Sequence, residues 1–148
     1  MRTRLVLAVL AALTLVACGE EPAQQAADNC DHSATTTNSG LEISELECGD
    51  GSEAGRGDLL TVHYVGRLED GTEFDSSRER GETFDVRLGA ELVNAGWEEG
   101  LTGVQQGTVR ELVIPPDLAY GENGVPPDIP PYATLTYEIE VLEIKDDA

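Results

Sequence analysis

The sequence predicts a domain of the α+β class, in which an antiparallel sheet has one face covered by a single short helix. Two observations support this class. Apolar and polar residues alternate with a period of two over several segments, which is typical of strands with one buried face. One segment alone, residues 94–101, has the pattern of a helix, and it is short. Together these patterns indicate a sheet with little helical cover.

The strands follow from this alternation and from the turn signals between them. Two of them, 59–68 and 133–144, each place four large apolar side chains on one face. The helix at 94–101 carries the single tryptophan, Trp97. Residues 69–71 (EDG) predict a hairpin, and the proline-rich segment 121–131 predicts a stiff turn that could border a pocket. In chain order, the expected strands lie around 41–46 and at 59–68, 82–88, 109–114 and 133–144.

The first 39 residues are expected to lie outside the domain. Two arginines precede an apolar run, 5–17, which is too short for a membrane span of about 20 residues but fits the core of a signal peptide. The run ends in LVAC, which resembles a bacterial lipobox, where Cys18 would receive a lipid after cleavage before it. An ordinary secretory signal with an incidental Cys18 is the alternative. The expected divisions are a lipoprotein signal peptide at 1–17, the lipidated cysteine and a flexible polar tether at 18–39, and the domain at 40–146.

The chain is strongly acidic, with 29 acidic and nine basic residues and a net charge of −20. Loss of Arg2 and Arg4 with the signal peptide would make this 7 − 29 = −22. Such a charge is repelled by phosphate backbones, so no nucleic-acid partner is expected. Anionic lipid headgroups repel it too, so a covalent lipid would be needed to hold it at a membrane. A solvated surface or a salt-rich habitat could each explain the acidity.

The remaining cysteines, Cys30 and Cys48, form a candidate disulfide if the chain is exported and Cys18 is lipidated. Such a bond would contribute roughly 3 kcal/mol by the chain-entropy estimate. Two free thiols are the alternative. His32 lies near Cys30, but nothing completes a metal-ligand set, so neither a metal nor a cofactor is expected.

Aromatic residues and one pair of oppositely charged side chains mark the candidate site. Asp75 and Arg80 follow the hairpin, without a nucleophile–base pair, a metal cluster or a phosphate loop. Spacing alone leaves two interpretations open: the rings form an ordinary core with a surface ion pair, or they line a site that acts by shape and desolvation. The six rings are those of Tyr64, Phe74, Phe84, Trp97, Tyr120 and Tyr137.

Four motifs carry a resemblance to a known family: VHYVGRLEDGTEFDSSRERG, LGAELVNAGWEEGL, AYGENGVPPDIPP and ATLTYEIEVLEI. They resemble the FKBP-type peptidyl-prolyl isomerases over about residues 40–144. The resemblance implies a half-open antiparallel sheet of five or six strands, wrapped around one short helix. Between them an apolar pocket would receive a proline ring. Trp97 would form its floor, and the walls would come from Tyr64, Phe74, Phe84, Val93, Ile129 and Tyr137.

The resemblance also implies roles for individual groups. Tyr120 would donate a hydrogen bond to a substrate carbonyl, as would the backbone N–H of Asn94. Asp75 would lie beside the twisting amide and join Arg80 and Tyr64 in a polar cluster. The implied activity is rotation of X–Pro bonds, with Asp75, Tyr120 and Tyr64 as the catalytic residues and proline-containing polypeptides as partners. A monomer is expected, assisting the folding of secreted or envelope proteins.

Some residues depart from the family's common pattern. Asn94 stands where a branched apolar residue is usual, and it is expected to make the pocket edge more polar. Asp128 adds a negative charge to the rim, which would favour substrates with basic residues and weaken the binding of macrolide inhibitors. These two residues keep an alternative open, a proline-peptide binding or chaperone module with little turnover. The lipobox implies a lipid-anchored protein on the periplasmic face of the cell envelope, and Gly19 after Cys18 favours the outer membrane where one exists.

Overall fold

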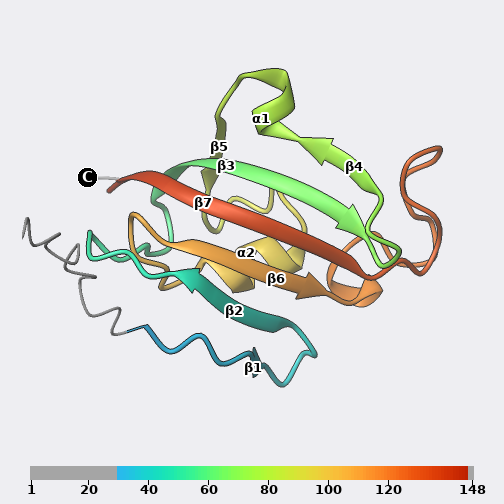
Figure 1. Cartoon of the computed structure of the whole chain (residues 1–148), viewed down its shortest axis with the longest axis horizontal. Helices are drawn as coiled ribbons and strands as arrows, with labels where there is room; N and C mark the ends of the chain where they lie inside the picture. The colour runs from blue at the N-terminus through green and yellow to red at the C-terminus, as the bar shows by residue number, and fades with distance from the viewer. Residues whose placement is uncertain (1–29, 147–148) are drawn as a thin grey trace, which may run out of the picture.

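The computed structural model describes residues 30–146, so the predictions of a signal peptide and of lipidation at Cys18 fall outside the described residues. The described chain forms one antiparallel sheet of seven strands, with the short helix α2 behind it (Figure 1). The strand order is β1-β2-β6-β7-β3-β4, and β5 also pairs with β3. The elements are β1 (Thr35–Thr36), β2 (Glu42–Glu47), β3 (Leu59–Leu68), β4 (Glu73–Ser76), α1 (Ser77–Arg80), β5 (Phe84–Arg87), α2 (Ala95–Leu101), β6 (Val109–Ile114), η1 (Pro116–Leu118) and β7 (Leu135–Lys145).

The two longest strands, β3 and β7, form the centre of the sheet and carry the predicted alternation. Val62 and Ile139, for example, face the core and are fully buried. The alternation in β7 changes phase at Leu142, because Val62 pairs with Val141 whereas Thr61 pairs with Glu143. The extra residue forms a β-bulge and is exposed, which lets Ile144 return to the core side.

Helix α2 packs against the inner face of β6 and covers the core. Two of its seven residues are glycines, and both are needed for this close approach. A Cβ atom at Gly96 would lie 2.4 Å from Ile114 Cγ2, and one at Gly100 would lie 2.6 Å from Leu112 Cδ1. The side chain of Arg110, which is 9% exposed, donates to the Gly100 carbonyl and so binds the end of the helix to the sheet.

The expected elements are present, with shifts of a few residues at some ends. The strands predicted at 59–68 and 109–114 have those bounds, and the predicted helix lacks only its first residue, Asn94, which is its N-cap. The sheet has more strands than the five or six expected. Two features that sequence patterns did not predict account for the difference, a paired segment before residue 40 and a strand followed by a helical turn at 73–80.

The predicted tether, 18–39, needs correction in its described part. Within 30–39, β1 pairs with β2 through backbone hydrogen bonds, which require no large apolar side chain. A disulfide also joins Cys30 to Cys48, whose Cα atoms lie 5.6 Å apart. The segment next to the domain is therefore fixed along the outer edge of the sheet rather than extending freely.

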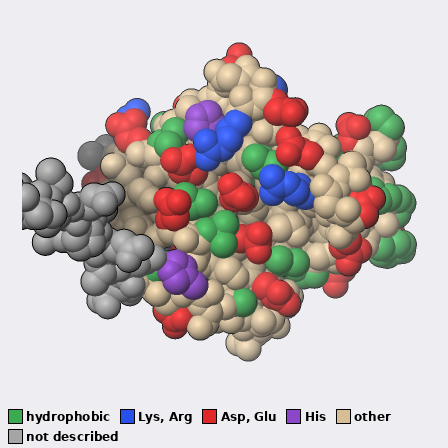
Figure 2. Space-filling view, in the orientation of Figure 1, with side chains coloured by type: hydrophobic (Ala, Val, Ile, Leu, Met, Phe, Trp, Pro, Cys, Tyr) green, Lys and Arg blue, Asp and Glu red, His purple; other side chains and the backbone are tan. Residues whose placement is uncertain are grey.

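Asp and Glu side chains are spread over the outer face of the sheet (Figure 2). Several arginine side chains on the surface form ion pairs with these carboxylates. Arg78, for example, pairs with Glu140, and Arg67 lies 3.9 Å from Glu138. Apolar side chains gather instead at the end of the molecule formed by the loop between η1 and β7. Among residues 30–146, we find no helix long and apolar enough to cross a membrane and no cluster of three metal-ligating side chains.

Candidate functional site

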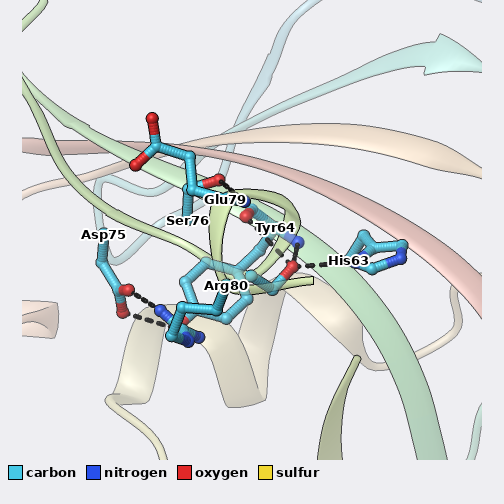
Figure 3. A network of polar contacts seen from close by, with 7 residues as sticks. His63, Tyr64, Asp75, Ser76, Glu79 and Arg80 are labelled. Carbon is cyan, nitrogen blue, oxygen red and sulfur yellow. Dashed lines mark hydrogen bonds and ion pairs between the residues drawn. The ribbon is translucent and has the colours of Figure 1, made fainter. Parts of the chain in front are cut away.

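The site is built around an interruption in the sheet beside Tyr64. On this edge of β3, pairing with β5 ends at Val62 and pairing with β4 begins at Val65. The hydroxyl of Ser77, at the start of α1, fills the gap by accepting a hydrogen bond from the Tyr64 backbone N–H at 2.9 Å. It also lies 3.0 Å from His63 Nδ1 (Figure 3). Ser77 is fully buried, so α1 is fixed directly against Tyr64.

The turn α1 directs an arginine back toward the preceding strand. Ser76 caps its start by accepting from the Glu79 N–H at 3.3 Å, and Gly81 closes its end in a left-handed conformation with φ 68°. This short turn places the Arg80 guanidinium against the carboxylate of Asp75, with which it forms an ion pair (Figure 3). The local structure thus follows from capping residues on both sides of a four-residue turn.

Tyr64, Asp75 and Arg80 form a closed polar network. The Tyr64 hydroxyl donates to Asp75, and Arg80 Nη2 donates to the Tyr64 hydroxyl at 3.0 Å. Burial raises the pKa of Tyr64, and the hydrogen bond to Asp75 raises it further. The phenol therefore stays protonated at neutral pH, and one carboxylate oxygen is held by each partner. Because Asp75 and Arg80 are each about two-fifths exposed, their pairing contributes orientation more than stability.

Trp97 lies at the centre of the aromatic cluster. It is 4% exposed, and three rings meet it edge-to-face. The ring centroids of Tyr64 and Tyr137 each lie 5.2 Å from that of Trp97, and the centroid of Phe84 lies 6.0 Å away. Edge-to-face packing is the favourable arrangement for aromatic rings, and it leaves a concave apolar surface above the indole.

A cavity of about 230 Å³ opens above these rings. Asp75 and three tyrosines line it together with Phe84 and Trp97, so aromatic rings and polar groups meet in one cavity. Of the residues expected at the site, eight line it, and Leu92, which is 80% exposed, lines it as well. The complete lining is Tyr64, Asp75, Phe84, Leu92, Val93, Asn94, Trp97, Tyr120 and Tyr137.

Phe74 and Ile129, which were expected in the walls, do not line the cavity, and neither does Arg80, which instead forms the expected polar cluster with Asp75 and Tyr64. Phe74 lies behind the wall, where it packs edge-to-face on Tyr137 with the centroids 5.6 Å apart. Arg80 contacts Asp75 and Tyr64 from the outer side. Ile129 is 5% exposed and belongs to the core cluster. Each supports the wall rather than forming its surface.

Two hydroxyl groups differ in their surroundings at the cavity mouth. Tyr137 is buried, and burial raises the pKa of its phenol, with a further rise from the neighbouring Tyr120. Tyr120 is 39% exposed, so its hydroxyl can reach a bound molecule. Tyr137 therefore remains a neutral donor inside the wall, while Tyr120 offers a donor at the opening.

The wall at residues 89–94 is held by the first turn of α2. The Glu98 carboxylate accepts from the backbone N–H of Gly89 at 2.6 Å and of Glu91 at 3.0 Å. Sequence reasoning overlooked both Glu98 and Ser77, because their partners are backbone groups of other segments. A capping signal could have located the starts of the two helices that carry these residues. Ser76 and Asn94 are these caps, and each lies three residues before the N–H that it binds.

A larger hollow of about 660 Å³ lies on the other side of Val93. It is bounded by Arg56, Leu88 and several glutamates of α2 and the preceding loop. It contains no aromatic ring, and its Glu98 carboxylate is held by the backbone N–H groups of Gly89 and Glu91. We therefore assign the candidate site to the smaller cavity, where apolar shape and polar groups meet.

Most of the domain is similar in sequence to one family of known proteins. The profile of a family described as FKBP-type peptidyl-prolyl cis-trans isomerase matches residues 51–142. The human peptidyl-prolyl cis-trans isomerase FKBP2 is 52% identical over 90 residues, which cover 61% of this chain and 63% of that protein. The chain thus spans a little under two thirds of that relative's length.

A bacterial relative is matched along nearly all of its length. The FK506-binding protein of Neisseria meningitidis serogroup B is 46% identical over 105 residues, covering 71% of this chain and 96% of that protein. Among solved structures, FkpA from Escherichia coli superposes with a TM-score of 0.72 and 42% identity, over 80% of this chain and 54% of that one. This likeness confirms the predicted fold class.

Proposed function

This chain belongs to the FKBP-type peptidyl-prolyl cis-trans isomerase family, and from that premise we propose that it catalyses the cis–trans rotation of X–Pro bonds in polypeptides. One observation carries the proposal: an aromatic cavity with Trp97 at its base has a fixed carboxylate, Asp75, at its edge. The cavity is small enough to suit a proline ring and its flanking amide rather than a large cofactor.

The reaction is a rotation, so the site needs no nucleophile. Rotating a peptide bond costs about 18–20 kcal/mol because resonance across the C–N bond is lost. X–Pro bonds populate both isomers but exchange in tens to hundreds of seconds. The planar amide is more polar than the twisted one, so an apolar cavity destabilises the ground state more than the transition state.

The residues of the cavity divide this task. The rings around Trp97 exclude water from the proline. The exposed Tyr120 hydroxyl and the backbone N–H of Asn94, which has no partner within residues 30–146, can each donate to a peptide carbonyl. Tyr64 and Arg80 hold the Asp75 carboxylate in place beside the rotating bond. Fixed dipoles of this kind stabilise a transition state without moving a proton.

The decisive measurement follows cis-to-trans conversion of a short X–Pro peptide with the full-length chain. We expect acceleration over the uncatalysed rate, and a large loss of that acceleration with Asp75→Leu. The second candidate function is a proline-peptide binding module with little turnover, which the polar substitution Asn94 and the charged Asp128 favour. Binding of the peptide without acceleration would support that second function instead.

We propose that the rim also sets substrate and inhibitor preference. Asp128 is exposed in the loop that follows Tyr120, a residue of the cavity lining, and the protein as a whole is strongly acidic. A peptide with a basic residue next to its proline would be attracted, whereas a macrolide inhibitor of the FK506 type would gain nothing from the added charge. The proposed outcome is binding of such inhibitors with reduced affinity.

We further propose that the protein acts as a lipid-anchored monomer of the cell envelope, facing the periplasm and assisting the folding of exported proteins. The support is the sequence of residues 1–18, with its basic start, apolar core and LVAC ending. Gly19 favours the outer membrane in a bacterium that has one. Incorporation of labelled fatty acid into the wild type but not into Cys18→Ala would support the anchor, and equal labelling of both would overturn it.

A further inference from the structure

Asn94 lies where the cavity wall meets helix α2, and its side chain and its backbone N–H have different surroundings. Its side-chain Oδ1 accepts a hydrogen bond from the backbone N–H of Trp97 at 3.0 Å. Its φ of −66° and ψ of 161° are those of a helix N-cap. Its own backbone N–H makes no hydrogen bond within the described residues and borders the cavity. The Asn94 carbonyl accepts from the same Trp97 N–H at 3.1 Å. Asn94 thus contacts Trp97 through its side chain and its carbonyl, and borders the cavity with its N–H.

The helix that bears Trp97 has little intrinsic stability. It is seven residues long, and helices shorter than about 12 residues are marginal on their own. Gly96 and Gly100 weaken it further, and the contacts of α2 with Ile114 and Leu112 leave no space for larger residues. The first turn therefore depends on its cap, and Trp97 lies in that turn.

Movement of the first turn would affect several walls of the cavity at once. Tyr64, Phe84 and Tyr137 all pack edge-to-face on the indole of Trp97. A frayed N-terminus would also rotate the peptide group of Asn94, because the capping conformation determines where its N–H points. The cap consequently controls the base of the cavity together with the Asn94 N–H that borders it.

We infer that Asn94 is a positioning residue for the proposed isomerase activity, on which this inference rests: its side chain fixes Trp97 and orients the Asn94 backbone N–H for the substrate carbonyl. The expectation that Asn94 makes the pocket edge more polar changes accordingly. The amide oxygen is used inside the protein, and only the amide nitrogen remains for a ligand.

Four variants of the full-length chain separate this role from direct contact with the substrate. Asn94→Ser and Asn94→Asp keep a side-chain acceptor for the cap and remove the amide nitrogen. Asn94→Val and Asn94→Ala keep the backbone N–H and remove the cap. Thr102→Val is the matched control, because it removes a side-chain hydrogen bond, 2.7 Å to the Glu98 carbonyl, at the other end of the same helix.

The measurements are kcat/KM on an X–Pro peptide and the fluorescence of Trp97, which is the only tryptophan of the chain. All variants are compared at a temperature where circular dichroism shows each to be folded. We expect Asn94→Val and Asn94→Ala to lose on the order of tenfold in kcat/KM and to shift the indole emission. Asn94→Ser and Asn94→Asp, which keep the cap, should lose less kcat/KM than Asn94→Val and should restore the indole emission. Thr102→Val, which lies outside the cavity lining, should stay within about twofold of the wild type, with unchanged emission.

Two results would overturn the inference. If Asn94→Ser and Asn94→Asp lose as much activity as Asn94→Val, the amide nitrogen contacts the substrate directly. If Asn94→Val matches the wild type in both activity and emission, the cap does not position Trp97. A wild type without turnover would overturn the proposed function instead, and the emission spectra of the same variants would still decide whether Asn94 fixes Trp97.

Discussion

Two regions of the molecule that flank Tyr120 in the fold, the cavity wall from β3 to α1 and the loop at residues 121–132, are built in different ways. The wall from β3 to α1 is held by side chains, since Tyr64, Asp75, Ser77 and Arg80 bond to one another or to the backbone behind them. The rim, residues 121–132, follows Tyr120 in the chain and contributes no residue to the cavity lining. It is held by backbone hydrogen bonds; for example, the Val125 N–H donates to the Ile129 carbonyl at 2.8 Å. Among the described residues, no side chain of this rim makes a hydrogen bond.

Under the proposed function, this difference separates the part that would act on the amide from the part that would meet the rest of the polypeptide. A network of side-chain bonds fixes the Asp75 carboxylate at the edge of the cavity. The rim, by contrast, exposes apolar groups such as Val125, at 42%, and Tyr132, at 68%. Because apolar contact is non-directional, a rim of this kind can accept many sequences around the proline. Turnover should therefore be sensitive to the cavity wall, and preference to the rim.

The largest expected effect is that of Asp75→Leu, which removes the partner of both Tyr64 and Arg80. A hydrogen bond to a charged group is worth about 1.5–3 kcal/mol, so kcat/KM should fall roughly 10- to 100-fold. Glu73→Leu is the control, because it makes the same change on the same strand outside the network. A similar loss in both variants would show that the network has no special role.

A smaller loss is expected at Tyr120, the residue of the cavity lining that precedes the rim. Tyr120→Phe removes a partly exposed donor at the cavity mouth while keeping the ring. A neutral hydrogen bond contributes about 0.5–1.5 kcal/mol, so kcat/KM should fall about 3- to 10-fold. Steady-state kinetics on an X–Pro peptide measures this effect. An unchanged rate would mean that Tyr120 does not bond the substrate.

The rim should change preference more than rate. Asp128→Ile removes an exposed charge, whose interactions are worth less than about 1 kcal/mol. We expect a loss of about two- to threefold in the preference for a Lys-flanked over a Glu-flanked X–Pro peptide. The same substitution should strengthen binding of a macrolide inhibitor in a titration.

Salt provides the internal control for this charge effect. The preference of the wild type should fall as ionic strength rises, because exposed charges are screened. Equal inhibitor affinities for the wild type and Asp128→Ile, together with a preference that is indifferent to salt, would remove Asp128 as a determinant.

The smallest effect is expected from pH. Burial raises the pKa of Tyr64 and of Tyr137 above the usual value near 10, so neither phenol titrates between about pH 6 and 9. We expect kcat/KM to be flat across that range. The stability that the two raised pKa values contribute is present in full below about pH 10 and is lost as pH rises toward the folded-state values.

Chemical denaturation at several alkaline pH values measures this loss, and replacement of Tyr137 by phenylalanine should reduce it. A step in kcat/KM near neutral pH would mean that a proton transfer participates in the reaction, contrary to the rotation mechanism.

Local pattern was enough to predict much of this molecule. The period-two alternation of 59–68 and 109–114 marks β3 and β6 at their observed bounds, because a strand with one buried face must alternate. The pattern failed where order depends on partners distant in sequence. β1 consists of two threonines that would be called a linker from composition, and only the free edge of β2 makes them a strand.

The candidate site shows the same division. The sequence alone provided the set of aromatic rings, the Asp75–Arg80 pair and the helix with Trp97, since each lies in a local motif. Only the tertiary structure decided that Phe74 and Ile129 stand behind the wall, that Ser77 fills the gap in the sheet beside Tyr64, and that the Asn94 side chain turns back onto its own helix. Strand register and the close packing of α2 on β6 determine these positions, and both are contacts between segments that no local window of sequence contains.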